Sequence, residues 1–278
     1  MRRNNEDRLM GGHKPTPSED APQLGNPMDF VTPTQFVQLP SKGRYPEGHP
    51  LHGKDSIEIK YMTAKDEDVL TNRSLLKKGL AIDRMIQNLV KDKSINARSL
   101  YIGDRNAIII NARASAYGAD YRTSVQCPAC GETSKFEFDL ADHEEYHGDD
   151  FDGFDINDNK DGTFSLVLPL SGINARIRPL TGQDELEMLS QGSNKEASEN
   201  LITKQMKRFI VDLNGYTDAK TINYVADNMV AGDAKHIRHC FKLISPDIKI
   251  EQKFTCKHCE HEEAMMVPFG TDFFWPDR

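Results

Sequence analysis

The sequence lacks a hydrophobic run long enough for a membrane helix, which needs roughly 18 consecutive apolar residues. The longest candidate, around Ala107–Ala112, is far shorter. The opening residues, MRRNNEDRLMGG, also lack the apolar segment of a secretion signal. The chain has 5 cysteines, and two CxxC pairs account for four of them, a pattern typical of thiols or metal ligands in a reducing compartment. We therefore expect a soluble protein without a membrane span.

Familiar catalytic motifs are missing as well. The sequence contains no P-loop, HExxH, GxSxG or GxGxxG motif. Glu144 and Glu145 are adjacent, so their side chains diverge and cannot form an acid–base pair. The stretch NDNKDG (157–162) is spaced like a calcium loop, but Leu168 stands where the bidentate glutamate would be. We predict a turn between two strands there, no catalytic residues and no small-molecule substrate.

Negative charge is concentrated in one segment. The formal net charge is -8, and residues 139–161 contain ten acidic residues and one lysine, a net of −9. The rest of the chain is therefore close to neutral. Nucleic-acid-binding proteins usually present a basic face, so this distribution makes nucleic acid an unlikely partner.

The two halves of the chain carry the same order of sequence signals. In the first half, residues 56–62 alternate like a strand, and Thr63 and Asp66 form a capping box. In the second half, residues 175–180 alternate in the same way, and Thr181 and Asp184 form the capping box. The apolar helical faces that follow comprise Ile82, Met85, Ile86, Leu89 and Val90 in the first half and Ile202, Met206, Phe209, Ile210 and Leu213 in the second.

The end of each half matches at one constant offset. A third helix is predicted to open at Gly103-Asp104 and at Gly232-Asp233, and each half ends in a strand, a CxxC knuckle and a strand. The matching pairs, which all share the same spacing in sequence, are Gly103/Gly232, Asp104/Asp233, Ile108/Ile237, Cys127/Cys256 and Cys130/Cys259. We predict an α+β fold made of two tandem pseudo-repeats, the alternative being two unrelated α+β halves with similar local signals.

This pattern suggests four segments. Residues 1–34 are rich in Pro, Gly, Asn and charge and are predicted to be a flexible N-terminal arm. Residues 35–138 form the first repeat, which ends in the first knuckle, and residues 139–162 form an acidic linker with a hairpin turn. Residues 163–278 form the second repeat, with the second knuckle and an aromatic C-terminal tail.

The two knuckles predict a structural metal site. Zinc prefers four tetrahedral ligands, and a CxxC turn supplies two thiolates. We predict one structural zinc ion bound by Cys127, Cys130, Cys256 and Cys259, joining the repeats in a zinc-ribbon-like site. Two alternatives remain open: a redox CxxC, or two separate sites that recruit histidines 143, 147, 258 and 261. Cys240 is expected to be a buried, inert thiol.

The C-terminus is unusually aromatic. Phe269, Phe273, Phe274 and Trp275 cluster in a chain that has 1 tryptophan. These rings either fold back on the core or anchor another subunit, and Phe273, Phe274 and Trp275 are the candidate partner-binding residues.

Three stretches resemble one known family. LPSKGRYPEG (39–48), the capped helix TAKDEDVL and the segment IGDRNAIIINARASAYG resemble the baseplate hub proteins of T4-like contractile-tailed bacteriophages, over residues 36–275. The resemblance implies a structural or assembly protein of the central hub that is made in the host cytoplasm, located in the virion tail baseplate and bound to other tail proteins. No catalytic residues carry over, and the resemblance does not distinguish a permanent subunit from an assembly factor.

Two other functions are consistent with the residues. Arg122, Lys135, Lys253 and Lys257 surround the knuckles, as expected for a zinc-ribbon protein that binds nucleic acid or regulates phage genes. A metalloenzyme would need an open coordination position at the metal.

Overall fold

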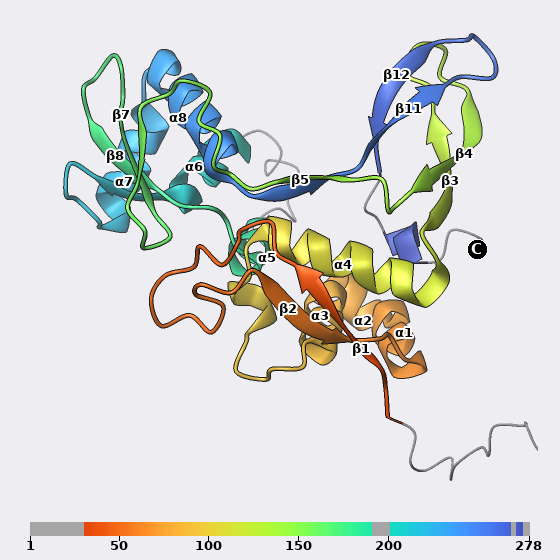
Figure 1. The fold of residues 1–278 in the computed structure, drawn as a ribbon. Coiled ribbons are helices and arrows are strands. Elements are labelled where there is room, and N and C mark those ends of the chain that lie inside the picture. The colour runs from red at the N-terminus through yellow and green to blue at the C-terminus, as the bar shows by residue number, and fades with distance from the viewer. Residues whose placement is uncertain (1–30, 191–200, 268–270, 275–278) are drawn as a thin grey trace, which may run out of the picture. The chain divides into compact units, whose positions relative to one another are not determined.

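The computed structural model describes residues 31–190, 201–267 and 271–274 (Figure 1). Pro33–Arg278 form one compact unit. The predicted arm, residues 1–34, lies almost entirely outside the described residues. The described fold mixes helices with several small antiparallel sheets. In the described ranges no helix has both the length and the hydropathy needed to cross a bilayer.

The first half opens with a two-stranded hairpin and a set of short helices. Strands β1 (Thr34–Gln38) and β2 (Ser56–Lys60) pair antiparallel, and the capping box of Thr63 and Asp66 starts the next helix as predicted. The helices that follow are α1 (Ala64–Thr71), α2 (Arg73–Lys77), α3 (Ala81–Leu89), the short 3-10 helix η3 (Ala97–Ser99) and α4 (Ile102–Tyr117). The predicted apolar face on α3 is buried, which holds this helix against the hairpin.

The second half contains a four-stranded antiparallel sheet and four helices. The sheet order is β6-β7-β8-β9, with β6 (Ile156–Asp158), β7 (Phe164–Val167), β8 (Asn174–Ile177) and β9 (Ile210–Leu213). The helices are α5 (Gly182–Ser190), α6 (Leu201–Phe209), α7 (Ala219–Asn228) and α8 (Ala231–Ile244). NDNKDG forms the turn between β6 and β7, as predicted.

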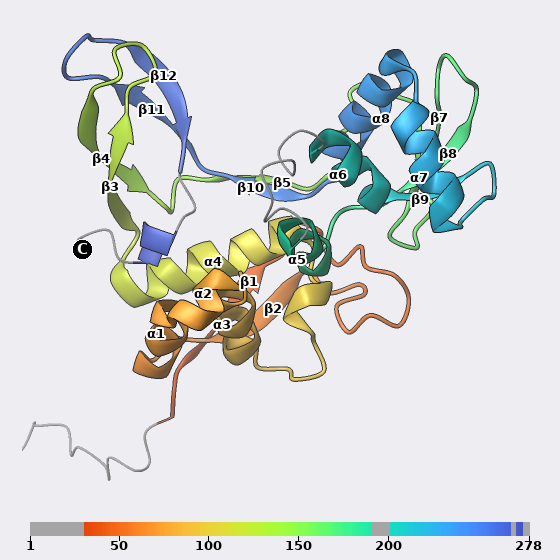
Figure 2. The same ribbon diagram turned by 180° about the vertical axis from the view of Figure 1, so that it is seen from behind.

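Two further hairpins and a short ribbon complete the fold. The hairpins pair β3 (Asp120–Gln126) with β4 (Thr133–Asp139) and β11 (Glu251–Thr255) with β12 (Glu262–Met266). In the ribbon, β5 (Glu144–Tyr146) pairs with β10 (Asp247–Lys249). Figures 1 and 2 show this ribbon between the two hairpins and the helices of the second half. The acidic segment is therefore partly strand, because β5 finds a distant partner.

Two expectations about helix and strand limits were wrong. The helical face expected to reach Leu213 ends at Phe209, because residues 210–213 pair with β8 instead. The single strand expected for DIKIEQKFT is broken at Ile250 into β10 and β11, since the two parts pair with different strands.

The buried residues group differently from the predicted segments. One core cluster contains apolar residues from Val37 to Leu140 together with Ile248, Phe254 and Phe274. The other cluster runs from Ile156 to Ile244. The last part of the second half therefore packs with the first half, because hairpin β11–β12 buries its apolar residues against β3–β4.

A buried carboxylate fixes the LPSKG loop to α4. The Asp104 carboxylate accepts hydrogen bonds from the Ser41 N–H (2.9 Å), the Ser41 hydroxyl (2.6 Å) and the Tyr45 hydroxyl (2.6 Å). Tyr45 stacks on Tyr101 and His49, which cover the carboxylate. Burial raises the pKa of Asp104, while the three donors oppose that change. Gly103 allows α4 to approach the chain closely, since a Cβ there would lie 2.0 Å from the Pro246 carbonyl oxygen.

The second half has a similar junction. The Asp233 carboxylate, at the start of α8, accepts hydrogen bonds from the Leu170 N–H (2.9 Å) and the Ser171 N–H (3.0 Å). These donors lie in LPLSG (168–172), which follows LPSKG (39–43) at the same sequence offset that relates the two pairs of cysteines. The pair Asp104 and Asp233 thus performs the same local task at corresponding positions of the two halves.

We expect Asp104→Ala to lower the free energy of unfolding by about 3 kcal/mol or more, because three buried donors lose their acceptor and each costs roughly 1–3 kcal/mol. Tyr45→Phe removes one of these bonds and also the acceptor of the buried Tyr101 N–H, so it should cost about 2 kcal/mol. Asp142→Ala, at an exposed position, is the control and should change stability by less than about 0.5 kcal/mol. Denaturant unfolding measures all three, and equal values for Asp104→Ala and the control would contradict the junction's importance.

Candidate metal centre

Two hairpins present the cysteines at their turns. Cys127 and Cys130 lie between β3 and β4, and Cys256 and Cys259 lie between β11 and β12. The hairpins pack through Phe136 and Phe254, whose ring centroids are 5.6 Å apart. They are also joined where the Gln252 side chain accepts from the Asp139 N–H and donates to the Asp139 carbonyl oxygen. These contacts bring the four thiols together.

The four sulfur atoms form one compact group. All lie within 4.8 Å of one another. The Cys127–Cys259 and Cys130–Cys256 sulfur pairs, each linking the two hairpins, are 3.7 Å apart. A tetrahedral ion with Zn–S bonds of about 2.3 Å separates its sulfurs by about 3.8 Å. The four cysteines can therefore hold a metal ion, and this donor set fits zinc.

Each knuckle has the same backbone geometry. In the first, the Cys127 N–H donates to the Glu132 carbonyl and the Gly131 N–H to the Cys127 carbonyl. In the second, the Cys256 N–H donates to the His261 carbonyl and the Glu260 N–H to the Cys256 carbonyl. The residue after the last cysteine is left-handed in both, with φ 75° at Gly131 and 58° at Glu260. Glycine adopts this conformation freely, whereas glutamate is strained in it.

Local hydrogen bonding favours thiolate at one ligand. The His258 N–H lies 3.4 Å from the Cys256 sulfur. This amide is the main cause that lowers the pKa of Cys256 to about 6, together with the Cys259 amide and the neighbouring thiols and against the effect of burial. Burial and neighbouring thiols raise the pKa of Cys259 and Cys130, so Cys256 is the thiol that this cluster favours as thiolate. Metal binding requires deprotonated cysteine, so the backbone of the second knuckle helps to prepare a ligand.

Three of the four histidines proposed for separate sites have other partners. His143 Nδ1 lies 3.0 Å from the Leu140 carbonyl oxygen, and His147 Nδ1 lies 3.1 Å from the Pro40 carbonyl oxygen. His261 lies 3.4 Å from the Glu263 carboxylate. Among the described residues, the four cysteines form the one group of three or more His, Cys, Asp or Glu that could bind a metal. The geometry thus favours a single shared site.

The basic residues near the knuckles are partly neutralised. Arg122 pairs with Glu137 at 3.0 Å, and Lys253 pairs with Glu262 at 2.7 Å. Lys135 and Lys257 line a shallow surface depression beside Phe136. Arg122 and Glu137 line the same depression, so its three basic residues share one acidic neighbour.

The aromatic C-terminal residues that the structure describes lie in the core. Phe273 is 1% exposed and Phe274 is 3% exposed. The Arg113 guanidinium donates to the Phe273 carbonyl oxygen, and the Phe273 ring packs against Tyr121 with centroids 5.0 Å apart. Phe273 and Phe274 therefore fold back on the core, which was one of the two alternatives for the aromatic C-terminus. Their buried rings leave little surface for a partner to contact. Phe269 and Trp275 lie outside the described residues.

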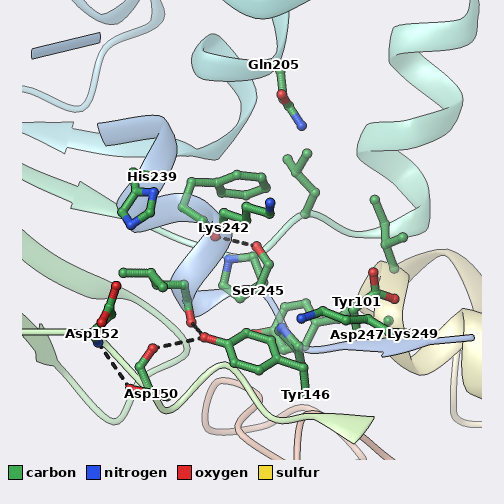
Figure 3. A pocket seen from close by; sticks show the side chains of 17 residues that line it. Tyr101, Tyr146, Asp150, Asp152, Gln205, His239, Lys242, Ser245, Asp247 and Lys249 are labelled. Atoms are coloured by element: carbon green, nitrogen blue, oxygen red, sulfur yellow. Dashed lines mark hydrogen bonds between the residues drawn. The ribbon is translucent and has the colours of Figure 1, made fainter. Parts of the chain in front are cut away.

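Sequence reasoning missed a cavity beside the ribbon. It has a volume of about 570 Å³ and is lined by residues of α4, β5, α8 and β10 (Figure 3). The Tyr146 hydroxyl lies 2.6 Å from the Leu243 carbonyl oxygen, and the Lys249 ammonium lies 5.0 Å from the Tyr146 ring centroid. Among the lining residues no nucleophile is hydrogen-bonded to a base, so the cavity shows no catalytic arrangement. No motif signalled it, because its walls come from segments far apart in sequence.

Comparison with known proteins gave one match. A family model described as T4 bacteriophage base plate protein matches residues 32–275, which is most of the chain. No curated protein and no solved structure is significantly similar to the chain.

We expect Cys127→Ser and Cys256→Ser to lose the bound metal equally, because each removes one ligand of the same ion. Both should lower the free energy of unfolding by roughly 5 kcal/mol, the value for a cross-link that closes a loop this long. Cys240→Ala, outside the cluster, should keep the metal. Elemental analysis and denaturant unfolding test this, and metal loss in one ligand variant alone would rule out a shared site.

We expect Glu260→Gly to stabilise the protein by about 0.5 kcal/mol. Relief of left-handed strain, worth about 1–2 kcal/mol, exceeds the added unfolded-state entropy of glycine, about 0.4–1 kcal/mol. Gly131→Ala is the reciprocal change and should destabilise by about 0.5 kcal/mol, because no atom lies within 4 Å of the added Cβ and left-handed strain exceeds the loss of unfolded-state entropy. The test is denaturant unfolding of the metal-bound chain, and the opposite order of stabilities would contradict it.

Proposed function

The chain belongs to the T4 bacteriophage base plate protein family, and we propose that it builds or assembles the central hub region of a contractile-tail baseplate through protein–protein contacts. The observation that carries this proposal is the family match over residues 32–275. The match covers nearly all of the compact unit Pro33–Arg278. A baseplate family suggests a structural, non-enzymatic role with other tail proteins as partners, in the virion tail after assembly in the host cytoplasm.

The four cysteines serve, in this proposal, as a structural zinc site. Four sulfurs leave no open position for water or substrate, so a zinc ion there contributes to folding and not to catalysis. Its ligands come from the end of each half of the chain, 126 to 132 residues apart. The ion would therefore fix hairpin β3–β4 to hairpin β11–β12 and make the surface built by both halves rigid.

We further propose that the two halves are tandem pseudo-repeats with the limits 35–138 and 163–278. The paired junctions of Asp104 and Asp233 support this, as do the equal knuckle hydrogen bonds at the same sequence offset. The two halves differ in length because the first half has an extra loop, Arg44–Asp55, which supplies Tyr45 to the Asp104 junction. The second half has no such loop before β8. A repeat of this kind gives the protein two similar surfaces for binding neighbours.

The alternative, a zinc-ribbon nucleic-acid-binding protein, has less support. Arg122 and Lys253 are paired with carboxylates, and the acidic segment lowers the net charge. Binding to DNA that weakens steeply with salt would favour this alternative.

Mass spectrometry of purified virions and of tail-assembly intermediates tests the proposed function. We expect this chain at a fixed ratio to other baseplate proteins in the intermediates, because it acts by binding them. Its presence in mature virions would identify a resident subunit, and its absence from them an assembly factor. Absence from both samples would overturn the proposal.

A further inference from the structure

Strand β1 has an open edge. Its pairing with β2 includes hydrogen bonds from the Tyr61 N–H to the Pro33 carbonyl and from the Leu39 N–H to the Asp55 carbonyl. Antiparallel pairing alternates, so the odd-numbered residues of β1 bond to β2 and the even-numbered residues point their N–H and C=O groups away. The backbone N–H and C=O groups of Thr34, Phe36 and Gln38 have no hydrogen-bond partner among the described residues.

The exposed face of the same strand carries an apolar side chain. Phe36 is 70% exposed and lies opposite Glu58 in the ladder. Strand β1 itself, TQFVQ, has no charged residue. Natural proteins usually protect such edges with charge, proline or a covering segment. An unprotected edge with an exposed aromatic ring is typical of a site that another strand completes.

The second half shows how this edge is filled. Strand β7 corresponds to β1 at the offset that relates the two halves, pairs with β8 as β1 pairs with β2, and has β6 on its other side. The Asn159 N–H donates to the Thr163 carbonyl, and Asn157 lies opposite Ser165. Thr163 and Ser165 match Thr34 and Phe36 at the same offset. The backbone groups that are open on β1 are thus the ones that β6 satisfies on β7.

The pairing of β6 with β7 also indicates which side chains a strand added to β1 would need. Ile156 of β6 lies opposite Leu166 and is 8% exposed, so it extends the core face of the sheet. Leu166 matches Val37 on β1, which is buried. A strand added to β1 therefore needs an apolar residue opposite Val37, and a second apolar residue opposite Phe36 would cover its ring.

We propose that the open edge of β1 binds an extended segment of another baseplate protein, which adds to the sheet as an antiparallel strand with apolar side chains opposite Val37 and Phe36. This inference rests on the proposed function and specifies the kind of contact through which the chain assembles. Main-chain hydrogen bonds at Thr34, Phe36 and Gln38 supply the affinity, and the two apolar contacts supply the register.

Gln38→Pro and Gln38→Ala form a matched pair that tests the edge. Proline removes the outward N–H that the added strand needs, and proline is tolerated on edge strands where that group faces solvent. Alanine keeps the N–H. Both variants should retain the metal and unfold at nearly the wild-type temperature, which confirms that the fold is intact.

The assay is complementation of a phage that lacks its own copy of this protein, with incorporation of the chain into tail intermediates quantified by mass spectrometry. We expect Gln38→Ala to match the wild type and Gln38→Pro to reduce incorporation at least tenfold. Phe36→Ala should reduce it by a smaller factor. Equal incorporation of Gln38→Pro and wild type overturns the edge proposal, whereas failure of the wild-type chain to incorporate overturns the proposed function instead.

Hydrogen exchange and sedimentation of the isolated chain test two other occupants of this edge, a segment of the same chain and a second copy of the protein. The amides of Thr34, Phe36 and Gln38 should exchange rapidly in the isolated chain, in contrast to those of Gln35 and Val37, and become protected in tail intermediates. Protection in the isolated monomer would mean that the edge is already filled within the chain. A dimer that Gln38→Pro dissociates would mean that a second copy fills it. Either result overturns the proposal.

Discussion

The meeting of four thiols at the turns of two hairpins is the constraint on which the rest of the structure depends. The Cys127–Cys259 pair is 132 residues apart in sequence, so the chain must fold back across the entire second half to form it. Holding such a loop closed offsets roughly 5 kcal/mol of chain entropy, by analogy with a covalent cross-link of the same span. The aromatic contact of Phe136 with Phe254 and the Gln252 hydrogen bonds position the hairpins before any ion binds. A metal ion bound by the four thiols would stabilise an arrangement that these packing contacts also favour.

One buried carboxylate in each half joins a loop to the start of a long helix. Asp104 and Asp233 both stand in the first turn of a long helix and both accept N–H groups from a Leu-Pro loop. Each junction therefore ties a strand end to a helix start, which fixes the direction of the helix that leads to a cysteine hairpin. The first junction is covered by Tyr45, Tyr101 and His49, whereas Leu170, beside the second, is 69% exposed. The two junctions therefore share their hydrogen bonding and differ in how far their surroundings are exposed.

Local features were predictable from sequence and distant pairings were not. The two capping boxes, the α3 face and the NDNKDG turn depend on residues a few positions apart, and the structure has all of them. The pairing of β5 with β10 joins residues about a hundred positions apart, and no local signal encodes it. Residues 210–213 show the same limit, because their apolar pattern suits a helix as well as a strand and only contact with β8 decides between them.

The sequence by itself determined the family, the candidate ligand residues and the local turns that present them, because these depend on residue type and short spacing. Tertiary structure decided that the cysteines form one group, that hairpin β11–β12 packs with the first half, and that Phe273 and Phe274 are buried. It also decided which strand edges are filled, leaving β1 open where β7 is covered. The physical reason is that backbone conformation is set by neighbours along the chain, whereas burial and strand partners are set by all the surfaces that compete for the same contacts.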